Sequence, residues 1–325
     1  MKKLLFILFI VPVFLFSCKK EHSGSSTSPS GKKYKVTFNV TNFLQKQTNF
    51  AVRHGAGNLA SDTITNLSGY LDVLYYVVYD QNGRVLQTPV MQDSTMSNMG
   101  MITDSLPAGN YAINIAAGKK GLTLTPDGDG YVGGDYYFSY GGGSNFQDTF
   151  WGDAAFTVGN GPVSQSVTLN RTVGEIELKI LDNMPATADS LFMTVYPVPI
   201  GIALNGDQGY TLGPLLQGTA SLAVAIPASA KGKPNYTANL LVGPTLSGTL
   251  VLNIVCKDAA NRVLGSATIG GPPPEKYALT VQQNVKTVVS GNLFTTSAPS
   301  QSFQVQLDTA WSSTTNQQSF SLRLH

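Results

Sequence analysis

The chain has 325 residues, of which 42% are hydrophobic and 12% are charged, and its formal net charge is +2 at pH 7. Charged residues are about half as frequent as in typical soluble proteins, and no basic patch is present, so the composition argues against a nucleic-acid-binding protein. Three histidines and two cysteines leave few groups for acid–base or zinc chemistry.

The N-terminal segment has the pattern of an export signal. Lys2 and Lys3 precede the apolar run LLFILFIVPVFLF at residues 4–16. A positive start followed by a short apolar run is typical of a signal peptide. The run is shorter than the roughly 20 residues that a membrane-spanning helix needs, and it contains Pro12. Residues 1–17 are therefore predicted to be a signal peptide.

Cys18 follows this run directly, and it has four open roles: half of a disulfide, a metal ligand, a reactive thiol, or the first residue of the mature protein. The stretch FLFSCKK resembles a bacterial lipoprotein signal, which implies that the Cys18 thiol carries a lipid and holds the protein at the outer membrane. The alternative is a plain signal peptide with an incidental cysteine. Residues 18–33, rich in Ser, Gly and Lys, are predicted to form a flexible tether.

Beyond the tether, short apolar stretches bounded by turn residues predict strands. Four pairs of similar phrases occur in the same order in the two halves. In the second pair Gly83 aligns with Asn261, which predicts a left-handed turn residue in both copies. The pairs are YKVTFNVTNF (34–43) with GEIELKILDN (174–183), LDVLYYVVYDQNGRVL (71–86) with LVLNIVCKDAANRVL (250–264), PAGNYAINI (107–115) with PPEKYALTV (273–281), and FTVGNGPVSQSVTL (156–169) with FTTSAPSQSFQVQL (294–307).

These repeats predict an all-β protein of two tandem antiparallel β-sandwich domains, each of about seven strands. The first domain is expected over residues 34–172 and the second over 173–325, joined near Thr172 and Val173. Residues 118–152 and 197–218 are predicted to be long surface loops. Cys256 lies in the apolar run TLVLNIVCKD and is predicted to be a buried free thiol.

The chain offers no recognisable catalytic centre, and no enzyme activity, cofactor or metal site is predicted. None of the histidines stands beside a Ser or Asp at the end of a predicted core strand, and no His or Cys pair has zinc-ligand spacing. The acidic loop PDGDGYVGGD lacks the remaining ligands of an EF-hand, which favours a flexible acidic loop. The histidines are His22, His54 and His325, and the loop carboxylates are Asp127, Asp129 and Asp135.

The segment 131–151 is rich in Tyr and Gly and offers flat rings that match the apolar faces of sugars. Tyr137 and Trp151 are the predicted glycan contacts. The alternative is that these rings cover one end of the sandwich as a loop core.

Several phrases resemble the fimbrillin and fimbrial-anchor proteins of Bacteroidetes, of the FimA, FimB and Mfa type. They are LYYVVYDQNGRVL, LPAGNYAINIAAG, FWGDAAFTV and the junction VTLNRTVGEIELKIL, which contains Arg171. The resemblance covers residues 34–307 and implies a two-domain, transthyretin-like lipoprotein. Such proteins build surface fimbriae or seat them in the outer membrane.

In that family, shaft subunits lose their first strand when a protease cuts after an arginine in the following loop, and a strand from a neighbouring subunit fills the vacated groove. The resemblance places this cut at Arg53, the only arginine before Arg84. The alternative is that Arg53 is an ordinary solvated loop residue. Loss of residues 34–43 would expose an apolar groove, because Val36, Phe38 and Val40 alternate toward one face.

The tail SFSLRLH is the predicted donor strand, and the alternative is that it completes the second sandwich. Its Phe320, Leu322 and Leu324 alternate with polar residues. The function expected from this reading is a structural component of cell-surface fimbriae that exchanges strands with sibling subunits. The second hypothesis is a surface lipoprotein that binds a host or surface glycan through loop 131–151.

Overall fold

The computed structural model describes residues 31–44, 67–126, 136–140, 146–205, 209–211, 217–245, 248–271, 278–295 and 297–308. Strands make up most of these residues, so the prediction of an all-β fold is confirmed. The helices are single turns: η1 (Leu67–Gly69), η2 (Ala228–Ala230) and α1 (Pro299–Ser302). No helix in the described ranges has the length and hydropathy to cross a membrane.

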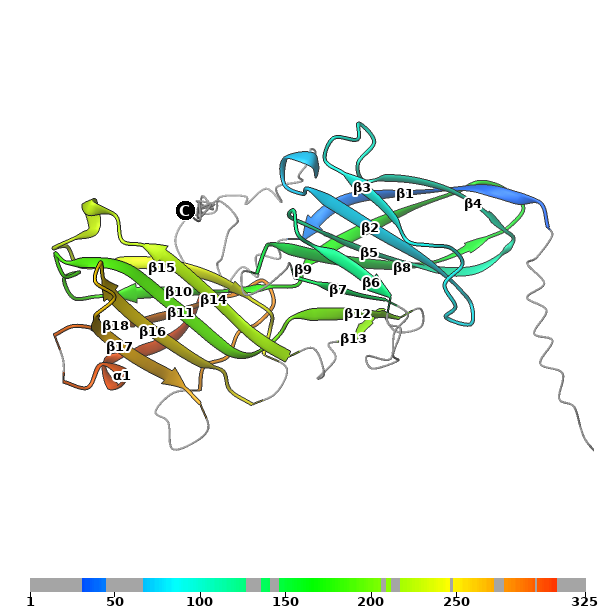
Figure 1. Cartoon of the computed structure of the whole chain (residues 1–325). Helices are drawn as coiled ribbons and strands as arrows, with labels where there is room; N and C mark the ends of the chain where they lie inside the picture. The colour runs from blue at the N-terminus through cyan, green and yellow to red at the C-terminus, as the bar shows by residue number, and fades with distance from the viewer. Residues whose placement is uncertain are drawn as a thin grey trace, which may run out of the picture.

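The first lobe is one seven-stranded sheet that folds over on itself, in the order β3-β2-β5-β8-β9-β1-β4 (Figure 1). In the middle of this order, β8 pairs with β9 at two positions, Phe150↔Arg171 and Trp151↔Asn170. The strands are β1 (Lys33–Leu44), β2 (Val73–Asp80), β3 (Val90–Asp93), β4 (Met101–Pro107), β5 (Gly109–Gly118), β8 (Thr149–Val158) and β9 (Val163–Arg171).

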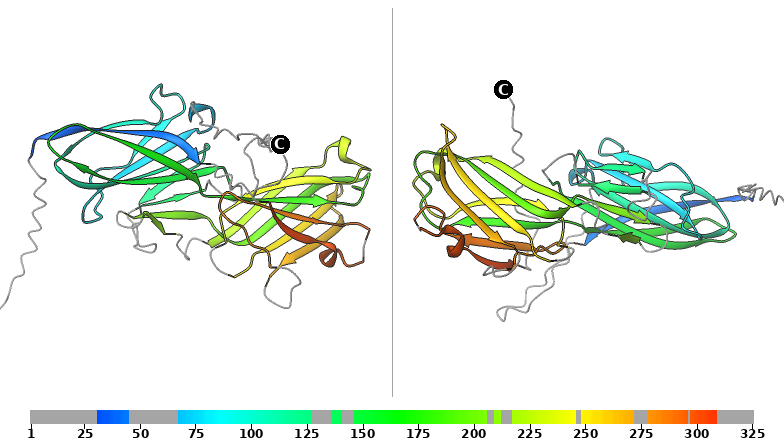
Figure 2. Two further views of the ribbon diagram at one scale, coloured as in Figure 1. Left: turned by 180° about the vertical axis from the view of Figure 1, so that it is seen from behind. Right: turned by 60° about the horizontal axis from the view of Figure 1, so that its bottom comes forward.

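The second lobe is a sandwich of two four-stranded sheets, in the orders β15-β10-β18-β19 and β14-β11-β16-β17. Figure 2 shows both lobes, end to end, from behind and from below. The strands are β10 (Gly174–Ile180), β11 (Ala188–Pro199), β14 (Gln217–Ala225), β15 (Tyr236–Val242), β16 (Val251–Asp258), β17 (Val263–Gly270), β18 (Lys286–Gly291) and β19 (Gln304–Asp308).

The two lobes share one topology. In the first, β2 lies between β3 and β5, and β1 lies between β4 and β9; in the second, β11 lies between β14 and β16, and β10 lies between β15 and β18. The sandwiches are antiparallel except at one place in each lobe, where β1 runs parallel to β9 and β10 runs parallel to β18. Hairpins make neighbours antiparallel, whereas these pairs join strands that are far apart along the chain.

The predicted repeat aligns equivalent strands of the two lobes in one of its four pairs of phrases. The other three pairs align strands that are not equivalent. Residues 34–43 and 174–183 fall on the equivalent strands β1 and β10. Residues 71–86 fall on β2, whose equivalent is β11, whereas residues 250–264 fall on β16 and β17. Residues 156–169 include β9, whose equivalent is β18, whereas residues 294–307 include the edge strand β19. Residues 107–115 include β5, whose equivalent is β16, whereas the described part of residues 273–281 lies before β18.

A shared turn explains the misleading second pair. Asp80 Oδ1 accepts bonds from the backbone N–H groups of Asn82 (2.8 Å) and Arg84 (3.0 Å), and Asp258 Oδ1 does the same for Ala260 (3.0 Å) and Arg262 (2.9 Å). Gly83 has φ 72° and Asn261 has φ 62°, so the predicted left-handed residue is confirmed at both positions. The phrase therefore repeats a turn and not a position in the fold.

The two segments predicted to be surface loops contain strands that pair with each other, and that prediction is wrong. They form a four-stranded sheet in the order β13-β12-β7-β6, in which β12 pairs with β7 across the two lobes. The partner strand lies far away in the sequence, so local patterns give no sign of it. The strands are β6 (Thr123–Pro126), β7 (Tyr136–Ser139), β12 (Gly201–Asn205) and β13 (Gly209–Thr211).

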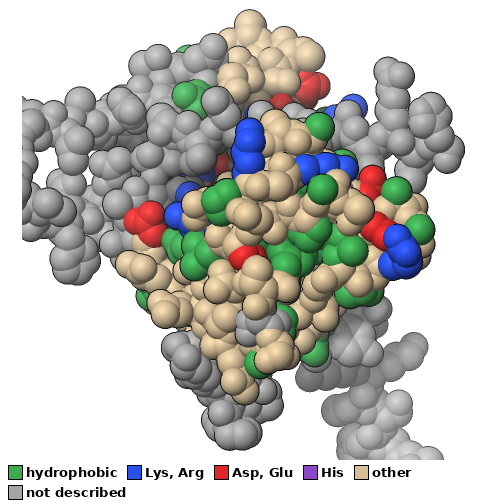
Figure 3. All heavy atoms as spheres, turned by 90° about the vertical axis from the view of Figure 1, so that its left-hand side faces the viewer, with side chains coloured by type: hydrophobic (Ala, Val, Ile, Leu, Met, Phe, Trp, Pro, Cys, Tyr) green, Lys and Arg blue, Asp and Glu red, His purple; other side chains and the backbone are tan. Residues whose placement is uncertain are grey.

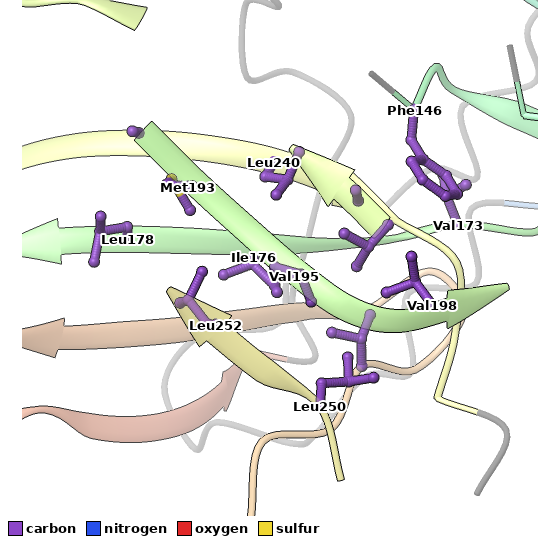
Figure 4. Packing of buried hydrophobic residues seen from close by; sticks show 14 of the residues in the cluster. Phe146, Val173, Ile176, Leu178, Met193, Val195, Val198, Leu240, Leu250 and Leu252 are labelled. Atoms are coloured by element: carbon purple, nitrogen blue, oxygen red, sulfur yellow. The ribbon is translucent and has the colours of Figure 1, made fainter. Parts of the chain in front are cut away.

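Two apolar cores follow from this arrangement. Leu74, Tyr76 and Val78 of β2 point into the first lobe, while Val73, Val77 and Tyr79 of the same strand belong to a cluster that continues into the second lobe. A strand buried on both faces reads as a continuous apolar run, as LYYVVY does. Figure 4 shows the second cluster, with Phe146 beside Val173 where the lobes meet. Cys256 belongs to it as a fully buried free thiol, as predicted, and burial raises its pKa to about 11.

Candidate functional site: the slot of the first strand

β1 lies between two strands and is held by main-chain bonds on both sides. It pairs antiparallel with β4 from Lys33↔Pro107 to Asn39↔Met101, and parallel with β9 from Val36↔Val163 onward. β1 is the first strand of the described chain, and Figure 1 shows it along one side of the first lobe. If β1 left, two strand edges with unpaired N–H and C=O groups would face each other across an open slot.

The side chains of β1 divide cleanly between the core and the surface. Val36 and Phe38 are fully buried and Val40 is 9% exposed, whereas Lys35 points outward and is exposed. Full burial of an apolar side chain of this size contributes about 1.5–3 kcal/mol. The slot is thus lined for alternate side chains, in the way that strand-accepting sites in general are.

The middle position of the slot has aromatic walls. Phe38 meets Phe156 edge to face, with ring centroids 4.9 Å apart, and Phe156 stacks on Tyr111 at 5.6 Å. The Tyr111 hydroxyl donates to the Pro107 carbonyl at 3.0 Å. Burial, together with the charge of Asp80, raises the pKa of Tyr111, so this donor stays protonated at neutral pH. The hydrogen bond to Pro107 therefore holds the Tyr111 ring of this stack in place.

The slot is closed tightly at the Val40 end. Gly100 has φ +86°, and its carbonyl accepts a bond from the Val40 N–H at 2.9 Å. A Cβ built on Gly100 would lie 2.0 Å from Leu67 Cδ1 and 3.6 Å from Val40 Cβ. Both the backbone conformation and the space therefore require glycine here.

β4 is joined to the far end of the sheet by side chains. Gln92 of β3 is buried; its Nε2 donates to the Met101 carbonyl at 3.0 Å, and its Oε1 accepts from the Gly100 N–H at 2.9 Å. Gln87 Nε2 donates to Asp104 Oδ2 at 2.6 Å. β4 pairs its main chain with β1, so these glutamines are what would hold β4 in position if β1 left.

Arg171 ties the end of the first lobe to the second. It forms a bidentate pair with Asp148 (2.7 and 2.6 Å), donates to Asn284 Oδ1 at 3.3 Å and lies over the Phe150 ring at 5.5 Å. The pair is nearly dry, with side-chain exposures of 4% for Arg171 and 13% for Asp148. A fork-shaped pair of this kind fixes orientation as well as distance.

A second buried charge cluster lies on the parallel strands β10 and β18. Lys286 Nζ is 3.2 Å from Glu175 Oε1 and 2.8 Å from Glu177 Oε2. Burial raises the pKa of Glu175 even though Lys286 opposes this change. Burial lowers the pKa of Lys286, but its bonds to the two carboxylates outweigh this effect and raise it. On the end of the second lobe, by contrast, exposed charges of both signs are interspersed (Figure 3).

Several of the predicted functional residues lie outside the described residues: Cys18, Arg53, Phe320, Leu322 and Leu324. Within the described ranges, no group of three or more His, Cys, Asp or Glu residues is placed to hold a metal ion. The structure does bring together Val36, Phe38 and Val40 on one face of β1, as their alternation predicted.

The prediction that Trp151 contacts a glycan does not agree with its position in the structure. This side chain lies on β8, is 8% exposed and belongs to the core cluster between the lobes, so it presents no open ring face to a sugar. Tyr137 lies on β7 and is half-buried. Phe138 and Tyr140 are also buried, which favours the alternative of a core that covers the end of the sandwich.

Of four residues that shape the slot, three carry no signal in the sequence and Gly100 carries a weak one. Phe156 and Tyr111 each stand in an ordinary strand pattern, and the contact between them depends on the pairing of β5 with β8. Gln92 occupies a short edge strand, where polar residues are common. Gly100 carried a weak signal, since it follows the turn-like stretch SNM and precedes a strand.

No protein-family model matches the sequence, and no curated protein matches it. Solved structures with a similar architecture include the fimbrial anchor protein Mfa2 of Porphyromonas gingivalis (7% identity, TM-score 0.49, covering 86% of this chain and 98% of that one). A proposed adhesin of Bacteroides thetaiotaomicron has 10% identity and a TM-score of 0.48 (87% and 98% covered).

A proposed cell adhesion protein of Bacteroides eggerthii has 12% identity and a TM-score of 0.47 (86% and 95% covered). Likeness at this level describes architecture and carries nothing about activity or partners. The chain is thus similar, in its overall arrangement of strands, to surface adhesins and a fimbrial anchor.

Proposed function

We propose that this protein is a structural subunit of cell-surface fimbriae that assembles by strand exchange. In this mechanism β1 is released and a strand from another subunit takes its place. The observation that carries the proposal is the position of β1: it is the first strand of the fold, it lies between two other strands, and it fills the core with Val36, Phe38 and Val40.

The arrangement around β1 suits such an exchange. Main-chain bonds from β4 and β9 supply affinity for any extended segment, and buried alternate side chains supply selectivity. The side-chain bonds of Gln92 and Gln87 would keep β4 at the correct distance while the slot is open. Release requires a cut between β1 and η1, for which Arg53 is the proposed site.

The proposal includes attachment of the newly exported chain to the outer membrane through a lipid on Cys18. The tail residues Phe320, Leu322 and Leu324 are proposed as the strand that this subunit donates to the slot of a sibling. Binding of glycan by loop 131–151 is not carried forward, because Trp151 is buried.

The test is an Arg53→Ala variant in the cells that naturally make the protein, with Arg84→Ala as the matched control. Arg84 is exposed and follows a surface turn. Arg53→Ala is expected to keep β1 and to be missing from sheared filaments, while Arg84→Ala enters them normally. Normal incorporation of the Arg53→Ala chain, with β1 still attached, would overturn the proposal.

A further inference from the structure

We infer that the β1 slot selects a strand from a different kind of subunit, one that carries an aromatic residue between two small aliphatic residues at alternate positions. This inference rests on the proposed strand exchange. It adds the side-chain pattern of the strand that enters the slot. It also excludes the tail of a second copy of this chain as that strand.

The central position calls for an aromatic ring. Phe38 is fully buried, and its ring meets the fixed Phe156 and Tyr111 stack edge to face. Edge-to-face contacts stabilise an aromatic pair beyond the effect of buried area alone. A leucine in the same place would leave part of this space empty, and packed cores relax only partly around such a void.

The two flanking positions are apolar and are occupied by valines. Val36 is fully buried and Val40 is 9% exposed, and both belong to the same apolar cluster as Phe38. A polar side chain at either position would lose its hydrogen bonds to water. A small aliphatic side chain fits each position as the valines do.

The tail of this chain does not have the required pattern in either of the two registers that fill all three positions from its alternating apolar face. If Phe320 takes the central position, Gln318 falls at the Val36 position and buries an amide among apolar side chains. If Leu322 takes the central position, Phe320 falls at the Val36 position, and the ring is then at the end and not in the middle.

Copies of this chain joined tail to slot would therefore be mismatched at every junction. The occupant that fits is a strand of the form aliphatic-x-aromatic-x-aliphatic, supplied by a sibling subunit of different sequence. The assembly that follows is heteromeric at this slot. If the test shows that the tail of a second copy enters the slot, the inference is contradicted.

The test uses the full chain with one specific protease site introduced between β1 and η1, so that β1 can be cut from the fold and left bound. Fluorescent peptides are then offered, and displacement of β1 is measured. The peptides are residues 33–44, the same peptide with Phe38→Leu, Phe38→Ala or Lys35→Ala, and residues 317–325.

The unchanged peptide and the Lys35→Ala control are expected to enter equally, because Lys35 points outward. Phe38→Leu is expected to bind up to about tenfold more weakly and Phe38→Ala at least about 100-fold more weakly. The tail peptide is expected not to enter at the same concentrations. Entry of the tail peptide as readily as residues 33–44, or equal binding of Phe38→Ala, would overturn the inference and leave strand exchange intact.

Failure of every peptide, including residues 33–44, would instead overturn strand exchange itself. A second measurement uses the uncut chain. Val36→Phe combined with Phe38→Leu places the Phe-x-Leu order of the tail at the first two positions and keeps Val40, and its thermal midpoint is expected to fall by about 5 °C or more. An unchanged midpoint would show that the slot does not discriminate order, which contradicts the inference.

Discussion

The ring of Phe38 meets the ring of Phe156 edge to face, with 4.9 Å between their centroids and 76° between their planes. This contact joins the strand proposed to leave with a strand that stays. It therefore contributes both to the stability of the subunit before assembly and to the choice of the strand that replaces β1.

Truncation of this ring should destabilise the uncut protein strongly. We expect Phe38→Ala to lower the free energy of unfolding by about 3–5 kcal/mol, because a fully buried ring is lost and a cavity remains. Lys35→Ala, on the exposed face of the same strand, should change it little. Urea unfolding of both variants provides the comparison, and equal effects would show that β1 does not contribute to the core as described.

Gln92 should matter most for β4. Gln92→Leu keeps an apolar contact but leaves the Gly100 N–H and the Met101 carbonyl without this partner, which should cost about 1–3 kcal/mol. Hydrogen exchange is expected to speed up at the amides of β4 more than at those of β9. Gln165→Leu, at a half-buried position whose side chain bonds to the neighbouring Ser166 carbonyl, serves as the control. An equal increase in hydrogen exchange at the amides of β4 and β9 would show that Gln92 does not specifically hold β4.

Two arginine–aspartate pairs of similar length offer a matched comparison. Arg171 and Asp148 are almost fully buried, whereas the Arg262 side chain, paired with Asp258 at 2.7 Å, is 77% exposed. Arg171→Ala leaves a buried carboxylate without its partner and should cost about 3–5 kcal/mol. Arg262→Ala should have little effect. Similar losses of stability in the two variants would mean that burial at the junction does not set the strength of the pair.

The buried Glu175 should give the protein a distinct pH dependence. Its pKa is raised in the folded state, so the folded state holds the proton more tightly than the unfolded state does. The free energy of unfolding should therefore fall as the pH rises from the ordinary glutamate value of 4.5 through the raised value.

Glu175→Gln removes this titration, and the variant should gain stability relative to the wild type across that window. Glu177→Gln, which removes the 2.8 Å pair with Lys286 but keeps Glu175, should retain the fall. Unfolding curves at several pH values test both variants. Parallel pH profiles for wild type and Glu175→Gln would contradict the assignment.

Local patterns predicted the strands but not their partners. The alternation of Val36, Phe38 and Val40 identified the buried face of β1, and the pairing of Gly83 with Asn261 identified two left-handed turns. The same turn chemistry led to a wrong alignment of the repeat, since a turn records local backbone geometry and not the place of a strand in the sheet.

The sheet between the lobes was missed for a related reason. β7 and β12 lie in segments rich in Gly and Pro that resemble loops, and they pair with each other although they are far apart in the sequence. Phe138 of β7 and Trp151 of β8 are both buried in the cluster that continues into the second lobe. Aromatic residues among glycines therefore gave the appearance of an exposed platform where the fold has a core.

The most direct test of strand exchange is the N-terminus and intact mass of the protein recovered from sheared surface filaments. The proposal predicts a chain that begins at His54 and has lost β1, with a lipidated form beginning at Cys18 in the membrane fraction. A filament fraction in which every chain still begins at Cys18 and retains β1 would contradict it.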